Sequence, residues 1–352
     1  MNPLVLMPSK PVTSARRQLL SFCEKALFHS NVHRLCRMLQ GDGGTTILMY
    51  HSVPGPDAAQ WIDPRDAVAP ALFEQQMQTL VKHCHVVSLT ELVEAIEIGR
   101  SLPNATVVIT FDDGYLDNFE VAAPILASFD LPATFFLATG YIDRESPQWI
   151  DELYSIYRAR SANVLHVGWL STLPYDLTRQ HDVDASYTAI SEIMLATDIA
   201  GRKRLFDELT VQLRPTRTPP RLTMNWDEVR RLQAMHSGFE IGVHTRDHLS
   251  LPCLDTERMA VELTQCIADV RTMLGLEPRF FSYPYGRSCE CARRLVANRF
   301  RAAVATDPPA LVRAGADLLA LPRVSPPDDP ALFRLYTSGA QPDMVRRLLR
   351  GA

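Results

Sequence analysis

Residues 105–115, ATVVITFDDGY, decide how this sequence is interpreted. The run Ala105–Phe111 is apolar and rich in β-branched side chains, which is typical of a strand buried on both faces. Because side chains alternate along a strand, Asp112 and Asp113 are expected to point in different directions. One carboxylate can then bind a metal while the other faces a substrate, although a solvated Asp-Asp-Gly turn would give the same pattern.

On both sides of this stretch, short β-rich runs alternate with amphipathic segments. The expected strands are Thr45–Tyr50, His85–Ser88, Ala133–Ala138, Phe239–Val243, Phe280–Tyr283, Ala302–Ala305 and Leu319–Val324. The expected helices are Leu72–Lys82, Thr90–Gly99 with Thr90 near its N-cap, Phe119–Phe129, 225–236, Asp255–Leu274 and 289–298. This βαβ rhythm predicts parallel strands in a barrel or a doubly wound sheet.

The rhythm breaks between residues 143 and 222, a stretch with helical patterns that ends in the proline-rich segment 215–220. We interpret it as a largely helical insertion that shapes substrate selection, since long excursions from a barrel rim often form walls or lids. Trp149 and Trp169 are candidates for stacking on a sugar there, or for anchoring the insertion's own small core.

A second group of polar residues, HTRDH at 244–248, follows the expected strand Phe239–Val243. The four-residue spacing brings His244 and His248 together on one helical turn or tight loop, which suits a metal that takes nitrogen ligands. Taken alone, such a pair is better explained by two structural histidines. Both polar groups, however, follow strands, and the carboxyl ends of strands are where α/β folds build active sites.

Two further candidates also follow strands. Phe281–Gly286 breaks into a Pro/Gly turn that can aim a backbone N–H at an oxyanion, or is a plain surface turn. His51 ends the first expected strand, where it is a candidate general acid or simply a packed residue.

TFDDGY at 110–115, HTRDH at 244–248 and SYPYG at 282–286 resemble, in this order, the first three motifs of the polysaccharide deacetylase family, the NodB-homology domain. The resemblance spans roughly residues 45–325 and implies an α/β fold, a distorted TIM-like (β/α) barrel. It also implies residue roles: Asp112 as catalytic base, Asp113, His244 and His248 as ligands of a divalent metal, most often zinc, and the Tyr285 backbone N–H as part of an oxyanion hole.

The sequence departs from the family pattern at two places. Ser282 stands where the family often has an arginine that orients the base, and Arg279 or Arg323 is a candidate substitute. The late Leu-x-His motif is absent, since Leu321–Val324 has no histidine, but LMYH at 48–51 looks like that motif moved to the front. This resembles circularly permuted members and makes His51 the expected general acid, with Asp307 as a supporting partner or a turn residue.

The resemblance implies a metal-dependent hydrolase that removes an N-acetyl group from an N-acetylhexosamine in a glycan, oligosaccharide or lipid-linked precursor. Two alternatives stay open. One is a catalytically inactive carbohydrate-binding protein on the same fold. The other is a deformylase or small-amide hydrolase with the same site, since function belongs to the site and not to the fold.

Length and charge fix the remaining expectations. The 352 residues carry a net charge of −4, whereas a nucleic-acid partner would call for a concentrated basic face. The seven cysteines, an odd number without a C-x-x-C pair, suggest a reducing compartment. We expect a basic N-terminal arm (1–44), a barrel (45–340) interrupted by the insertion, and a tail (341–352). With no evident signal peptide or membrane span, the protein is expected in the cytoplasm, where the amphipathic segment 16–39 either contacts the membrane surface or packs on the barrel.

Overall fold

The computed structural model describes residues 44–339, apart from 169–170, 172, 307–309 and 314. Almost all of the expected arm 1–44, with its helix 16–39, lies outside the described residues, as do the tail 341–352, Trp169 and Asp307.

The core of the fold is a parallel sheet whose strands follow the order β1-β3-β4-β7-β8-β9-β10, with β2 paired to the start of β3. Their bounds are β1 Thr46–Tyr50, β2 His85–Val86, β3 Thr106–Phe111, β4 Ala133–Leu137, β7 Phe239–Val243, β8 Phe280–Ser282, β9 Ala302–Ala305 and β10 Leu321–Pro322. Neighbouring strands are parallel throughout this path, as the βαβ rhythm predicts.

The two ends of the sheet meet beside β1. A parallel bridge joins Leu48 to Val324, and the Val324 backbone is hydrogen-bonded to Met49 and Ile47 at 2.9 Å each. The sheet therefore closes into a barrel, which confirms the expected fold class. The first strand lies between β3 and the last strand, while the circular permutation itself stays a prediction.

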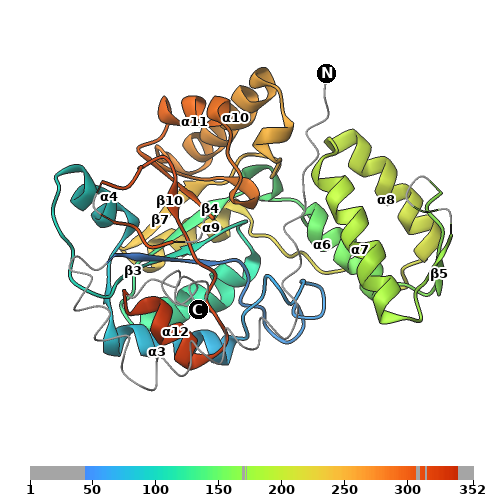
Figure 1. The fold of residues 1–352 in the computed structure, drawn as a ribbon, viewed down its shortest axis with the longest axis horizontal. Helices are drawn as coiled ribbons and strands as arrows, with labels where there is room; N and C mark the ends of the chain where they lie inside the picture. Colours follow the sequence, from blue (N-terminus) through green and yellow to red (C-terminus); the bar gives the residue numbers. More distant parts are fainter. Residues whose placement is uncertain (1–43, 169–170, 172, 307–309, 314, 340–352) are drawn as a thin grey trace, which may run out of the picture.

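Helices surround this barrel (Figure 1). They are α3 Pro70–His83, α4 Leu89–Glu97, α5 Ala123–Ser128 preceded by the π-turn Asn118–Ala122, α9 Trp226–Met235, α10 Thr256–Leu274, α11 Glu290–Ala297 and α12 Pro330–Thr337. Short 3₁₀ turns lie at Thr139–Tyr141, Leu251–Cys253 and Pro284–Gly286.

Local capping explains several helix bounds. The Asn225 side chain and Glu228 form a reciprocal capping box at the start of α9, and Gly275 ends α10 with φ of 67°. Helix α4 begins at Leu89, one residue earlier than expected, and Thr90 lies near its N-cap as predicted. The cap is Ser88, whose hydroxyl accepts a hydrogen bond from the Glu91 backbone N–H.

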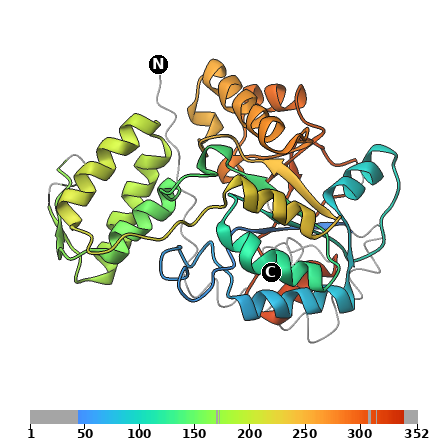
Figure 2. The same cartoon turned by 180° about the vertical axis from the view of Figure 1, so that it is seen from behind.

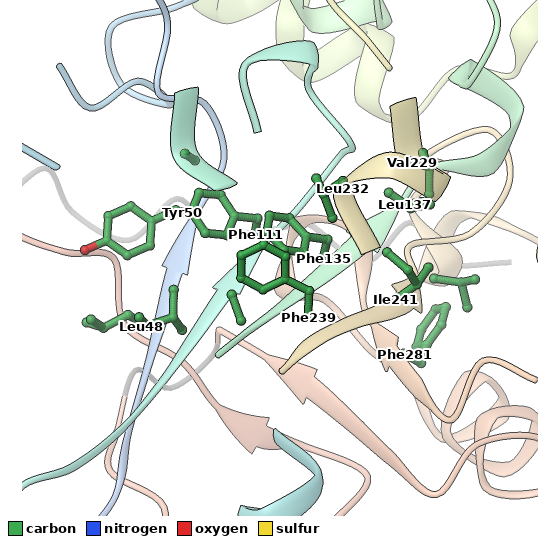
Figure 3. Packing of buried hydrophobic residues seen from close by; sticks show 14 of the residues in the cluster. Leu48, Tyr50, Phe111, Phe135, Leu137, Val229, Leu232, Phe239, Ile241 and Phe281 are labelled. Atoms are coloured by element: carbon green, nitrogen blue, oxygen red, sulfur yellow. The ribbon is translucent and has the colours of Figure 1, made fainter. Parts of the chain in front are cut away.

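The strands are buried on both faces, so their side chains form two hydrophobic clusters. Alternate residues such as Ile47, Val108 and Phe136 pack together on one face, with further side chains from β8, β9 and β10, which identifies it as the inside of the barrel. On the outer face Tyr50, Phe111, Phe135 and Phe239 form a row of rings across four strands, with centroids 5.0–5.4 Å apart (Figure 3). Each such pair contributes roughly 0.5–1.5 kcal/mol beyond its area burial.

The insertion forms a helical lobe at one side of the barrel, visible from both directions (Figures 1 and 2). It consists of α6 Trp149–Ala159, the strand pair β5 Val164–Leu165 and β6 Tyr175–Asp176, α7 Gln180–Leu195 and α8 Ile199–Leu213. The lobe has its own hydrophobic core, and Trp149, only 4% exposed, belongs to it. Trp149 therefore anchors the insertion, and the sugar-stacking interpretation of this residue is wrong.

Within the described part of the chain, no helix has the length and apolar character to span a bilayer.

Candidate active site

The two carboxylates of the TFDDGY motif lie at the carboxyl end of β3 and diverge as expected. The Asp112 backbone N–H donates to Tyr50 O at 3.0 Å and so extends the pairing of β3 with β1. Asp113 then adopts a left-handed backbone, with φ of 77°. Aspartate adopts this conformation more readily than most residues other than glycine, so it suits the turn that follows β3.

His244 and His248 lie on the loop after β7, where Thr245 and His248 also have positive φ values of 61° and 49°. The Glu262 carboxylate holds this loop, because it accepts hydrogen bonds from the backbone N–H groups of Arg246 and Asp247 at 3.0 and 2.9 Å. Sequence reasoning missed Glu262. The available signal was a charged residue on the apolar stripe of α10, which also carries Met259, Leu263 and Cys266.

The structure brings Asp113, His244 and His248 together as the sequence predicts. The two Nε2 atoms are 3.2 Å apart, and Asp113 Oδ1 lies 3.4 Å from His248 Nε2 and 3.7 Å from His244 Nε2. All three side chains are buried. Three ligand atoms of this kind, gathered within 4.8 Å, form a potential metal centre.

The charge state of this cluster fits a cation. Asp113 Oδ1 is buried without a hydrogen-bond partner, and burial raises the pKa of Asp113 to about 7, against the opposing charge of His51 and with help from Asp112. Burial also lowers the pKa of His244 to about 4 and the pKa of His248 well below its usual value. Two neutral imidazoles and one unsatisfied carboxylate oxygen are suitable ligands for a divalent metal, and they leave coordination positions open.

Asp112 has different partners. Arg323, at the end of β10, donates to its two carboxylate oxygens at 2.8 and 2.5 Å, and both side chains are almost fully buried. Ser282 Oγ accepts from Arg323 at 2.8 Å and donates to Asp112 at 3.2 Å. Of the two candidate arginines, Arg323 is therefore the one that orients Asp112. Arg279 was a wrong candidate, since it is half exposed and pairs with Glu240.

These contacts set the protonation state of Asp112. Burial opposes ionisation of its carboxyl, but the charge of Arg323, followed by that of His244, lowers the pKa of Asp112 far below its usual range. Bidentate arginine to carboxylate pairs are among the strongest charge-assisted hydrogen bonds. The site thus holds one carboxylate ionised and rigid beside a second one whose Oδ1 has no hydrogen-bond partner.

His51 follows β1 and lies next to this pair of aspartates. Its carbonyl oxygen accepts a hydrogen bond from the Asn118 side chain at 2.8 Å, and its imidazole is close enough for its charge to lower the pKa of both aspartates. The ring is half-buried and borders a cavity of about 350 Å³, which Arg65, Asp66 and residues 325–328 also line. His51 is therefore accessible from this cavity, on the side of β1 where residues 64–68 and 325–328 lie.

The SYPYG turn reaches the same place from β8. Tyr285 has φ of 59°, and Gly286 packs so closely on Thr306 that a Cβ atom would lie 1.6 Å from its Oγ1. The Tyr285 hydroxyl also contacts the His248 side chain, with 3.2 Å between Oη and Nδ1. Sequence reasoning assigned only the backbone of Tyr285, and no pattern in the sequence pointed to this side-chain contact.

Comparisons with known proteins give one family match and several similar structures. The sequence profile of the family described as "Polysaccharide deacetylase" matches residues 99–300. A poly-β-1,6-N-acetyl-D-glucosamine N-deacetylase of Escherichia coli K12 is 36% identical over 70 residues, which span 19% of this chain and only 10% of that protein.

Solved structures show the same fold. The deacetylase PplD of Streptococcus pyogenes, in complex with acetate, has a TM-score of 0.54 at 18% identity, over 84% of this chain and 98% of that one. IcaB of Ammonifex degensii has a TM-score of 0.56 at 18% identity, over 85% and 98% of the two chains.

Proposed function

The chain belongs to the polysaccharide deacetylase family, and from this premise we propose that it removes the N-acetyl group from an N-acetylhexosamine in a glycan, oligosaccharide or lipid-linked precursor. The observation that carries the proposal is the buried cluster of Asp113, His244 and His248, with its unpartnered carboxylate oxygen, beside the ionised Asp112. Such a site serves hydrolysis of an amide by water.

Asp113, His244 and His248 would hold a divalent metal, for which we propose zinc. A metal bound there supplies a Lewis acid that polarises the amide carbonyl and lowers the pKa of a neighbouring water.

Asp112 is the proposed general base. A carboxylate takes a proton only when it is ionised and within hydrogen-bond reach, and the Arg323 pair secures the ionised state. Arg323 and Ser282 also fix the direction of the carboxylate, so that one geometry is presented to the attacking water. The same pairing makes Asp112 a weaker base, because a carboxylate with a lower pKa binds a proton less strongly.

Tyr285 and His51 complete the proposed chemistry. The Tyr285 backbone N–H donates to the oxygen that gains negative charge as the carbonyl becomes tetrahedral, and a donor of this kind is worth on the order of 3 kcal/mol. His51, protonated, gives its proton to the leaving amine. Acetate and a free amino sugar are the products, with one water consumed.

Relatives support the substrate class. The E. coli protein is named for deacetylation of poly-β-1,6-N-acetyl-D-glucosamine, and the PplD structure contains acetate. The matched stretch covers a tenth of the E. coli protein, so its polymer is not carried over to this chain. Cytoplasmic localisation, with membrane contact through residues 16–39, stays a prediction.

Acetate release tests the proposed function. We expect purified protein incubated with N-acetylglucosamine oligosaccharides to release acetate and free amine in equal amounts, and a chelator to stop the reaction until zinc is restored. Binding of the oligosaccharides with no free amine after zinc addition would instead identify a catalytically inactive carbohydrate-binding protein. Activity on N-formyl sugars but not on their N-acetyl counterparts would identify a deformylase.

His51→Gln tests the general acid. We expect kcat for amide substrates to fall by about 10²–10⁴, the usual worth of a general acid. An aryl acetate, whose phenolate leaves without protonation, should be hydrolysed at nearly the wild-type rate. The matched control is His85→Gln, because His85 is an exposed histidine at the start of β2. An equal loss on both substrates would contradict the role of His51.

A further inference from the structure

A chain of side-chain contacts joins the helical lobe to the metal cluster. Trp149, the first residue of α6, donates its indole N–H to Tyr285 Oη at 2.7 Å. The same Oη lies 3.2 Å from His248 Nδ1 and donates to the His248 carbonyl oxygen at 3.2 Å. Tyr285 also packs on the hydrophobic core of the lobe.

The donors and acceptors along these contacts determine the tautomer of His248. The indole of Trp149 is a donor with no acceptor, so it occupies one lone pair of Tyr285 Oη. A carbonyl oxygen can only accept, so both 3.2 Å contacts of Oη are hydrogen bonds only if its single hydrogen goes to the His248 carbonyl oxygen. Oη is then left with an accepting lone pair, which only a protonated Nδ1 can satisfy. His248 is therefore held as the Nδ1–H tautomer, with its Nε2 lone pair directed at Asp113 and His244.

His244 is oriented in another way. Its Nδ1 lies 2.8 Å from the backbone carbonyl oxygen of Ser282, within the barrel itself. The two imidazoles of the cluster are thus fixed from different parts of the molecule, one by barrel backbone and the other by side chains that reach into the lobe. On the lobe side, Arg202 of α8 stacks over Trp149, with 4.7 Å between its guanidinium carbon and the centroid of the indole ring.

We propose that Trp149 and the Tyr285 hydroxyl are positioning residues for the metal, through which the helical lobe fixes the tautomer and direction of His248. The lobe is then part of the metal site's support as well as a candidate wall for substrate. Partners that orient a ligating histidine typically account for a 10–100-fold difference in metal affinity.

Zinc titration of metal-free protein by calorimetry tests this inference without reference to turnover. We expect Tyr285→Phe, which keeps the backbone N–H, to raise the zinc dissociation constant at least tenfold. Trp149→Phe removes one neutral hydrogen bond and should raise it about fivefold. Because Trp149 acts through Tyr285, the double variant should bind zinc no more weakly than Tyr285→Phe alone.

Tyr157→Phe is the matched control. Tyr157 is a buried tyrosine of the same lobe whose hydroxyl bonds to Ser186 Oγ at 3.1 Å, away from the metal cluster, and its variant should bind zinc like wild type. Wild-type affinity in Tyr285→Phe, additive effects in the double variant, or an equal loss in Tyr157→Phe would each overturn the inference. Should Tyr285→Phe not fold, Trp149→Phe against Tyr157→Phe decides the question.

The inference rests on the metal site of the proposed function, and the titration separates the two. Failure of the wild-type protein to bind zinc would overturn both. Tight wild-type binding with unaltered variants would overturn the positioning role alone.

Discussion

Replacing Asp112 with asparagine is expected to lower kcat by at least about a thousandfold while the protein still binds one zinc ion. Asparagine keeps the shape of the side chain but cannot take a proton from the attacking water. The proposed zinc ligands Asp113, His244 and His248 are untouched by the change. Acetate release, measured beside a zinc titration of the same preparation, checks both halves of the prediction.

The stability of this variant requires attention because the change leaves Arg323 buried without its anionic partner. Breaking a buried ion pair by removing one member typically costs about 3–5 kcal/mol. The rates of this variant should therefore be measured at a temperature well below the midpoint of its thermal unfolding. The paired control is Asp113→Asn, which is expected to lose zinc affinity along with activity. Full turnover in Asp112→Asn would refute its assignment as the base.

The barrel and the metal cluster were predictable because their determinants are local. Each strand is a short apolar run, and each functional group stands at the carboxyl end of one. Since β3, β4 and β7 are consecutive in the sheet, the loops that follow β3 and β7 open at the same rim. Asp113, His244 and His248 converge for that reason, although they come from distant parts of the sequence.

The supporting residues could not be predicted in the same way, because their roles depend on packing between distant segments. Arg323 was one of two candidates, and only closure of the barrel between β10 and β1 places it on Asp112. The hydrogen bond from Trp149 to Tyr285 depends on how the lobe docks against the barrel. In the sequence, Glu262 is one more charged residue of a long amphipathic helix. Its role depends on the loop after β7, whose backbone N–H groups donate to its carboxylate.

Arg323→Met is expected to lower kcat/KM at pH 7 by about a hundredfold, since the base loses both its orientation and its counter-charge. Methionine fills much of the buried space but donates no hydrogen bond. The charge and hydrogen bonds of Arg323 then no longer offset burial, which raises the pKa of Asp112, so this pKa moves upward from its depressed value. The acidic limb of the pH profile of kcat/KM should shift to higher pH.

The pH dependence of stability should change as well. In the wild-type protein the depressed pKa of Asp112 contributes stability that is present above the unfolded-state pKa, about 3.9, and is lost as pH falls toward the native value. In Arg323→Met the buried carboxylate is unpaired, so ionisation destabilises the fold instead. The difference in unfolding free energy between the two proteins should therefore grow as pH rises from 4 to 7, toward about 3–5 kcal/mol.

Arg279→Met is the matched control, because Arg279 is half exposed and pairs with Glu240 rather than with Asp112. Exposed pairs of this kind contribute about 0–1 kcal/mol, so this variant should keep the wild-type pH profile. Denaturant unfolding at several pH values and the profile of kcat/KM together decide the matter. If the acidic limb stays in place in Arg323→Met while activity falls, Arg323 supports the barrel without setting the charge of the base.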